Sequence, residues 1–168
     1  MALDGVPKRC RLVPSLESAP LFLWSDGIDF TIHEKSIMKI LLVEDSKFLK
    51  MATERALTTA GDEVISASDG DQALSMAREH LPTLILLDIM LPKMSGPDVL
   101  KALKEVPATA QIPVIMLTSL SQKNAAQLER DGASGFFEKS DSMLGRGPDS
   151  LVAAVDRMLK SKTGARLI

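Results

Sequence analysis

The chain has 168 residues, 45% of them hydrophobic, and a formal net charge of -2 at pH 7. This composition suits one globular domain of ordinary size, and the small net charge gives no general electrostatic reason to bind nucleic acid or an anionic membrane. The single cysteine, Cys10, excludes an internal disulfide and a cysteine-based metal cluster, as is typical of proteins in a reducing cytosol.

The first 37 residues read as an extension of the folded part. Pro7, Pro14 and Pro20 interrupt this segment, and no strand or helix period is sustained in it. We therefore expect residues 1–37 to be disordered, or to reflect a start codon assigned too early. No apolar run approaches the roughly 18 residues that cross a bilayer, and no export signal is recognisable, so we expect a cytoplasmic protein without membrane insertion.

From Met38 onward, short apolar runs alternate with segments of helical spacing. The predicted strands are 39–43, 63–67, 83–87, 113–118 and 134–138. The predicted helices are 46–60, 70–80, 97–106, 121–131 and 149–160. Such alternation favours right-handed crossovers and a parallel sheet covered by helices on both faces. We predict a doubly wound α/β domain over residues 38–160, with five strands and five helices, and a short tail over 161–168.

Residues at several predicted helix ends agree with these boundaries. Ser46 is placed to cap the first helix and Gly61 to end it, while Pro97 falls where a first-turn proline is tolerated. Gly132 follows the helix that begins near Ser121. These local signals are independent of the apolar period, so their agreement strengthens the prediction.

Polar residues stand at the carboxyl ends of the predicted strands. They are Glu44 and Asp45 after the first strand, Asp88 after the third, Thr118 and Ser119 at the fourth, and Lys139 after the fifth. Each residue alone has an ordinary explanation as a turn residue, a cap or an exposed charge. Because ligands of open parallel sheets bind beyond the carboxyl ends of the strands, their joint occurrence favours a functional site.

Three carboxylates gathered at one edge need a cation. Two of them repel by about 4 kcal/mol at a separation of about 4 Å and an effective dielectric constant near 20, and Lys139 offsets only part of this. Mg²⁺ prefers one or two carboxylates together with water and phosphate oxygens. If Asp88 attacked a phosphoryl group, Lys139 could pair with one phosphoryl oxygen and Thr118 could donate a hydrogen bond to another, so an aspartyl phosphate would form.

Four ordered segments resemble the receiver domain of two-component response regulators. These segments are ILLVEDS at 40–46, LILLDIMLPKMSG at 84–96, PVIMLTS at 113–119 and GASGFFEKS at 132–140. The resemblance extends from about Met38 to Leu159 and implies a flavodoxin-like fold with strand order 2-1-3-4-5.

The resemblance also implies roles for individual residues. Asp88 would be the phosphorylated residue, and the Mg²⁺ ligands would be Glu44, Asp45, Asp88 and the backbone carbonyl of Met90. Thr118 and Phe136 would be the switch residues, and Lys139 would assist the reaction. The sequence departs from the family at Ser140, where receivers commonly carry a proline in a cis peptide, and at Phe136, where a tyrosine is frequent.

By the same resemblance, the chain would accept a phosphoryl group from a sensor histidine kinase or a phosphotransfer protein. It would then signal through a phosphorylation-dependent contact with a downstream target protein, as stand-alone chemotaxis regulators do, with no direct contact to nucleic acid. It would catalyse only its own phosphorylation and dephosphorylation. An aspartate-nucleophile phosphatase would need an acid at the position of Met90, and a nucleotide-binding module would need a glycine-rich loop. A receiver-like interaction module that is not phosphorylated stays open as an alternative.

Overall fold

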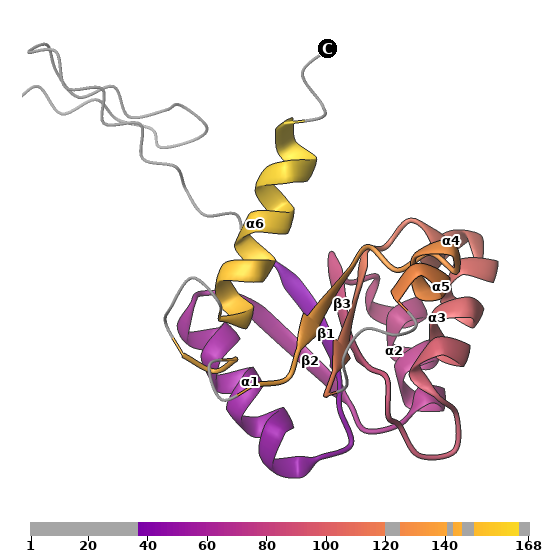
Figure 1. The fold of residues 1–168 in the computed structure, drawn as a ribbon, viewed down its shortest axis with the longest axis horizontal. Coiled ribbons are helices and arrows are strands. Elements are labelled where there is room, and N and C mark those ends of the chain that lie inside the picture. The colour runs from indigo at the N-terminus through magenta and orange to yellow at the C-terminus, as the bar shows by residue number, and fades with distance from the viewer. Residues whose placement is uncertain (1–36, 120–124, 141–142, 146–149, 165–168) are drawn as a thin grey trace, which may run out of the picture. The chain divides into compact units, whose positions relative to one another are not determined.

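The structure, a computed structural model, describes residues 37–119, 125–140, 143–145 and 150–164. The chain divides after Lys35, so the predicted extension lies almost wholly outside the described residues. Figure 1 shows the remaining part as a central sheet with helices on its two sides. No described helix is both long enough and apolar enough to cross a membrane.

Five parallel strands form one sheet in the order β2-β1-β3-β4-β5. The strands are β1 (Lys39–Val43), β2 (Glu63–Ala67), β3 (Leu84–Asp88), β4 (Val114–Thr118) and β5 (Gly135–Glu138). This order confirms the predicted topology, and each strand begins and ends within one residue of its predicted bounds. The strand order reverses at β1 and β3, where an open α/β sheet offers its binding crevice.

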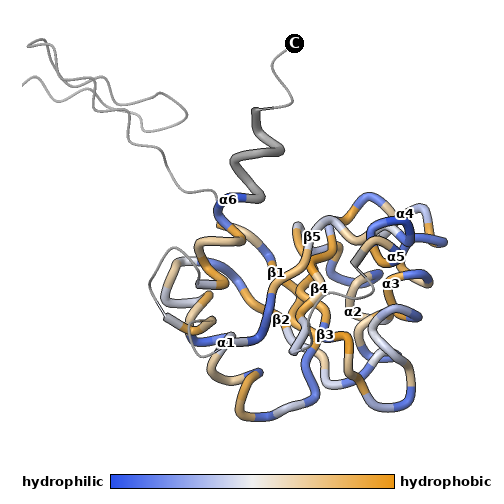
Figure 2. The backbone as a smooth tube through the Cα atoms, in the orientation of Figure 1, coloured by the Kyte–Doolittle hydropathy of each residue, from blue (hydrophilic) through white to orange (hydrophobic). Residues whose placement is uncertain are grey.

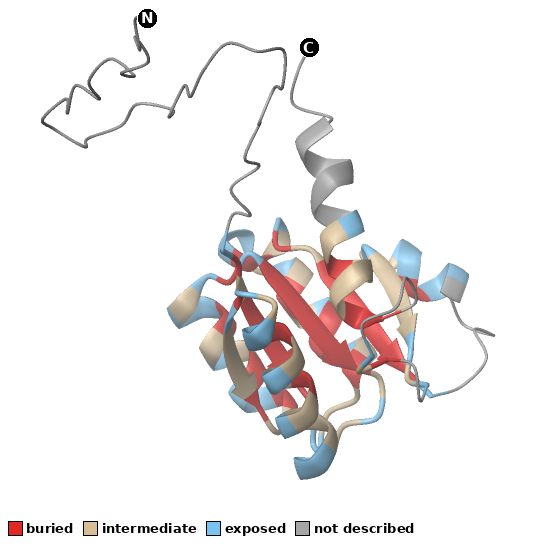
Figure 3. Ribbon diagram, turned by 90° about the vertical axis from the view of Figure 1, so that its left-hand side faces the viewer, coloured by how far each residue is buried: buried red, intermediate tan, exposed pale blue. Residues whose placement is uncertain are grey.

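Alternate residues of the central strands face two separate cores. In β1, Leu41 and Val43 belong to one core, whereas Ile40 and Leu42 belong to the other. Both sets are fully buried, which explains why β1, β3 and β4 are continuous apolar runs, as strands covered on two faces are. Figure 2 shows the hydrophobic residues gathered along these strands, and Figure 3 shows the same strands as the most buried part of the described residues.

The helices cover both faces of the sheet. They are α1 (Lys47–Thr59), α2 (Gly70–His80), α3 (Gly96–Glu105), α4 (Pro107–Ala110), α5 (Ala125–Arg130) and α6 (Leu151–Gly164). Side chains of α2, α3 and α5 enter the first core, and side chains of α1 and α6 enter the second. The two-faced arrangement agrees with the predicted doubly wound fold. α6 reaches Gly164, four residues beyond its predicted end, and residues 121–124 of the predicted fourth helix lie outside the described part.

The described residues contain six helices where the sequence predicts five. The additional one is α4, a single turn that follows directly after α3. Proline disfavours helical backbone in the residue before it, and Val106, which precedes Pro107, is extended with φ -94° and ψ 118°. Pro107 then starts the new turn, where a missing N–H costs nothing. The Thr109 hydroxyl donates a hydrogen bond to the Leu103 carbonyl at 2.7 Å and so joins α4 to the end of α3.

The predicted helix ends are largely confirmed. The Ser46 hydroxyl accepts a hydrogen bond from the N–H of Leu49, and Pro97 stands in the first turn of α3. Gly61 and Gly132 have φ of 94° and 101°, a left-handed conformation that glycine adopts without steric cost. These turns lead from α1 into β2 and from α5 into β5.

Candidate functional site

The register of the sheet places the predicted residues at one edge. Val43 pairs with Leu87, so the residues that follow them, Glu44 and Asp88, are neighbours across two adjacent strands. Thr118 pairs with Glu138, and the N–H of Lys139 donates to the Thr118 carbonyl at 2.7 Å. Residues far apart in the sequence therefore meet where the central strands end.

Lys139 joins two buried carboxylates. Its Nζ lies 2.6 Å from Oε2 of Glu44 and 2.6 Å from Oδ2 of Asp88. Glu44 is 2% exposed and Asp88 is 4% exposed, so this ion pair lies in a region from which water is largely excluded. One ammonium group cannot neutralise two carboxylates, and the cluster keeps a net negative charge.

Burial changes the pKa of the Glu44 carboxyl group. Loss of hydration raises the pKa of the Glu44 carboxyl above its ordinary value of 4.5, and the neighbouring charge of Asp88 acts in the same direction. The hydrogen bond from Lys139 and the N–H of Ser46, which lies 3.2 Å from Oε1, oppose this rise. The Glu44 carboxylate is therefore held in an environment that favours a further positive charge.

Asp45 completes a set of three carboxylates. One oxygen each from Glu44, Asp45 and Asp88 lies within 4.8 Å of the other two. Asp45 is exposed, whereas its two partners are buried, so the cluster opens toward solvent on the side of Asp45. An all-oxygen donor set with excess negative charge suits a hard divalent cation such as Mg²⁺. The residues present thus fit the predicted metal.

The loop after β3 is folded tightly around Asp88. Oδ1 of Asp88 accepts a hydrogen bond from the N–H of Met90 at 3.0 Å, and the N–H of Gly96 donates to the Ile89 carbonyl at 3.0 Å. A Cβ atom on Gly96 would lie 2.1 Å from the Asp88 carbonyl oxygen, closer than any real contact. Only glycine fits there, a requirement that the sequence around Gly96 does not reveal.

Thr118 and Phe136 lie on the same face of the sheet. Phe136 pairs with Met116, two residues before Thr118, and strand residues two apart point to the same side. Thr118 is buried, and Phe136 is partly buried against the first core. Both predicted switch residues are thus on one side of β4 and β5. The described residues contain no cis peptide bond, so the Lys139–Ser140 peptide is trans.

The structure also contains a contact that the sequence did not predict. Oδ2 of Asp69, before α2, lies 3.0 Å from Nζ of Lys93, in the loop between β3 and α3. The two residues are 24 positions apart, and lysine at position 93 has no local pattern that indicates its partner. No sequence signal could have found this pair.

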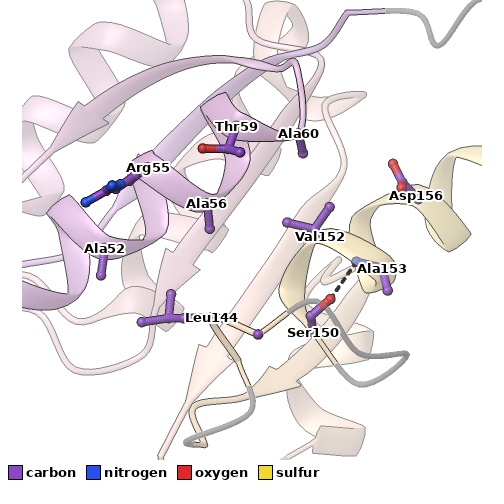
Figure 4. Close-up of a pocket in the computed structure, with 11 residues that line it drawn as sticks. Ala52, Arg55, Ala56, Thr59, Ala60, Leu144, Ser150, Val152, Ala153 and Asp156 are labelled. Carbon is purple, nitrogen blue, oxygen red and sulfur yellow. Dashed lines mark hydrogen bonds between the residues drawn. The ribbon is translucent and has the colours of Figure 1, made fainter.

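A groove of 640 Å³ lies elsewhere, between α1 and α6. Figure 4 shows a mixed lining, in which small side chains such as Ala56 and Ala153 lie beside larger ones such as Arg55. The Ser150 hydroxyl accepts a hydrogen bond from the N–H of Ala153. Asp156 is the one carboxylate among the described residues that line it. The groove lacks the clustered charges found at the ends of the central strands, the strand-end site formed by Glu44, Asp45, Asp88 and Lys139.

Comparison with known proteins gives consistent matches. A family model described as the response regulator receiver domain matches residues 40–144. The response regulator PleD of Caulobacter vibrioides is 41% identical over 109 residues, which cover 63% of this chain and 24% of PleD. The polar-differentiation response regulator DivK of Brucella anthropi is 38% identical over 105 residues, which cover 62% of this chain and 85% of DivK.

A solved structure extends the match to the fold. The chemotaxis response regulator CheY4 of Vibrio cholerae superposes with a TM-score of 0.65 and 28% identity, over 73% of this chain and 99% of that protein. The chain spans only about a quarter of PleD but most of DivK and CheY4. The similarity therefore covers one domain, the one that contains the strand-end site.

Proposed function

This chain belongs to the family of response regulator receiver domains, and from that membership we propose that it is a two-component signalling protein phosphorylated on Asp88. The observation that carries the proposal is the cluster of Glu44, Asp45 and Asp88 held by Lys139 at the end of the central strands. A capping or turn function would not require two buried carboxylates on one ammonium.

The proposed reaction moves a phosphoryl group from a phosphohistidine on a partner protein to Asp88. A carboxylate oxygen of Asp88 attacks phosphorus, the bond between the histidine nitrogen and phosphorus breaks, and an aspartyl phosphate forms. The leaving imidazole keeps the electron pair of the broken bond and takes up a proton. Asp88 is suited to this attack because the hydrogen bond from Met90 fixes the orientation of its carboxylate.

Glu44, Asp45 and Asp88, with the backbone carbonyl of Met90, would hold Mg²⁺. When bound, this ion supplies positive charge that neutralises the carboxylates and the phosphoryl oxygens. Lys139 would exchange its contact with Asp88 for one with a phosphoryl oxygen while it keeps Glu44 in place. The buried position of both carboxylates strengthens these charge interactions relative to water.

Thr118 and Phe136 would transmit the modification. The Thr118 hydroxyl would donate a hydrogen bond to a phosphoryl oxygen, and Phe136, on the same face of the sheet, would move into the space that this shift vacates. Phe136 has no hydroxyl, so only packing can hold it in either position. The surface near α5, β5 and α6 would then present a changed shape to a downstream target protein.

The proposed partners follow from this mechanism. They are a sensor histidine kinase or phosphotransfer protein as donor and a downstream protein as target, both in the cytoplasm. We propose no direct contact with nucleic acid and no catalytic activity beyond phosphorylation and dephosphorylation of the chain itself.

The test is phosphorylation by a small donor. We expect the full chain, incubated with Mg²⁺ and acetyl phosphate, to gain one phosphoryl group by intact mass, and chelation of Mg²⁺ to abolish the gain. Asp88→Asn should abolish it as well, whereas the exposed Asp71→Asn, a matched loss of one carboxylate, should retain it. A folded wild-type chain that gains no phosphate would contradict the proposal and favour the alternative of an unphosphorylated interaction module.

A further inference from the structure

Asp69 connects two loops that border the strand-end site. It stands at the amino end of α2, where its Oδ1 accepts a hydrogen bond from the N–H of Gln72 at 2.9 Å. Its Oδ2 lies 3.0 Å from Nζ of Lys93 in the loop after β3. Each carboxylate oxygen therefore has a different partner, one within its own helix and one in the loop that follows Asp88.

Lys93 adopts an unusual backbone conformation. Its φ is 67°, in the left-handed region that residues with a side chain rarely adopt. Its side chain is 68% exposed and contributes nothing to either core, so packing does not explain the choice of lysine. The contact with Asp69 is the feature that gives this side chain a defined position.

A second contact joins the same two segments. A Cβ atom on Gly70 would lie 2.7 Å from the Val99 side chain and 2.9 Å from the Met94 side chain, so the start of α2 packs directly on the loop and on α3. The loop itself is closed by the N–H of Met94, which donates to the Pro92 carbonyl at 2.8 Å. Residues 89–95 are therefore tied by hydrogen bonds of their own and packed on α2, and the contact between Asp69 and Lys93 adds a link on the solvent side.

We infer that Asp69 and Lys93 form a clasp that positions residues 89–95, and with them Met90, for binding of the divalent cation. This inference rests on the proposed function, because the cation is the one proposed above. Asp69 and Lys93 are positioning residues: neither belongs to the carboxylate cluster. The hydrogen bonds from Gln72 and Lys93 lower the pKa of Asp69, so its carboxylate is charged at neutral pH and available to Lys93.

The clasp should affect metal affinity more than overall stability. Exposed ion pairs contribute little to the stability of a folded domain. A metal ligand on a loop, by contrast, binds well only when the loop is already in place, and loss of an outer partner of a ligand typically weakens metal binding by about tenfold or more. For a clasp three residues from Met90 we expect a smaller loss, about threefold to tenfold.

The experiment is a calorimetric titration of the full chain with Mg²⁺. Asp69→Asn keeps the cap of α2, because asparagine caps as well as aspartate, but removes the charge that faces Lys93. Lys93→Gln removes the other partner. We expect each substitution to raise the dissociation constant for Mg²⁺ by about threefold to tenfold. The dissociation constant of the double variant should be no higher than that of either single variant, because both substitutions remove the same contact. Asp71→Asn, which removes a charge from the same turn, should bind as the wild type does.

A second readout separates positioning from unfolding. Without Mg²⁺, amide hydrogen exchange in residues 89–95 should be faster in both single variants, while the thermal midpoint stays near that of the wild type. Wild-type affinity for Mg²⁺ in both variants would overturn the clasp, even with faster exchange. An additive loss in the double variant would overturn it too. Failure of the wild type itself to bind Mg²⁺ would instead overturn the proposed function.

Discussion

At the scale of single residues, the surroundings of Glu44 shift the pKa of its carboxyl group. It is almost fully buried, and its pKa is raised by loss of hydration and by the charge of Asp88, against the hydrogen bond from Lys139. A carboxyl whose pKa is higher in the folded than in the unfolded chain binds its proton more tightly when folded. The stabilisation that this carboxyl provides is fully present at a pH below its pKa in the unfolded chain. It is lost as the pH rises through its pKa in the folded chain.

The raised pKa of Glu44 can be tested by titration. In Mg²⁺-free buffer, carbon-13 NMR should place the midpoint of the Glu44 carboxyl above 4.5. Asp88→Asn should lower this midpoint because it removes a neighbouring negative charge, and Lys139→Met should raise it because it removes the donor that favours the carboxylate. A wild-type midpoint at or below 4.5, or shifts of the opposite sign, would contradict the arrangement of charges described for the site.

At the scale of elements, the loop between β3 and α3 depends on a close backbone approach. Gly96 starts α3 directly against the Asp88 carbonyl oxygen, and the atoms that a Cβ would meet are backbone atoms, which cannot rotate away. Gly61 offers the opposite case, since a Cβ there would meet nothing within 4 Å although φ is 94°. Gly96 is thus required because a side chain has no room there, whereas Gly61 is favoured because of its left-handed backbone.

We expect Gly96→Ala to be the more destabilising of the two substitutions. Gly61→Ala should cost about 1 to 2 kcal/mol, the usual cost of left-handed backbone with a side chain. Gly96→Ala should cost about 3 kcal/mol or more, because the loop and α3 must both shift. Unfolding by urea, with the slope compared between variants, measures both losses. Equal losses would mean that the approach of Gly96 to Asp88 is relaxed in solution.

At the scale of the whole molecule, the proposed cation site would couple metal binding to folding. Folding brings Asp88 beside Glu44 and Asp45, so a cation that needs all three carboxylates would bind only the folded state and stabilise it. At a Mg²⁺ concentration 100 times the dissociation constant, the gain is about 2.7 kcal/mol.

Thermal unfolding should reveal this coupling. We expect Mg²⁺ to raise the unfolding midpoint by several degrees relative to NaCl of equal ionic strength. Asp45→Asn should remove most of this rise while it leaves the metal-free midpoint nearly unchanged, because Asp45 is exposed. Asp71→Asn should keep the rise. The same rise in the wild type and in Asp45→Asn would exclude Asp45 from the cation site.

The sequence by itself determined the strands, their parallel arrangement and the edge at which Glu44, Asp45, Asp88 and Lys139 meet. These features depend on the apolar period and on the residue that ends each strand, both of which are local properties of the chain. The extra turn α4 also has a local cause in the sequence, the proline at position 107, which interrupts α3 and begins a new turn.

Only the tertiary structure decided how deeply the carboxylates are buried, that Lys139 joins Glu44 to Asp88, and that Asp69 meets Lys93. The three ion contacts join residues 24 to 95 positions apart, and both these contacts and the burial depend on how helices pack against the two faces of the sheet. A local pattern carries no information on such distances. The residue types that meet at the site could therefore be anticipated from the sequence, whereas their burial and their charge contacts could not.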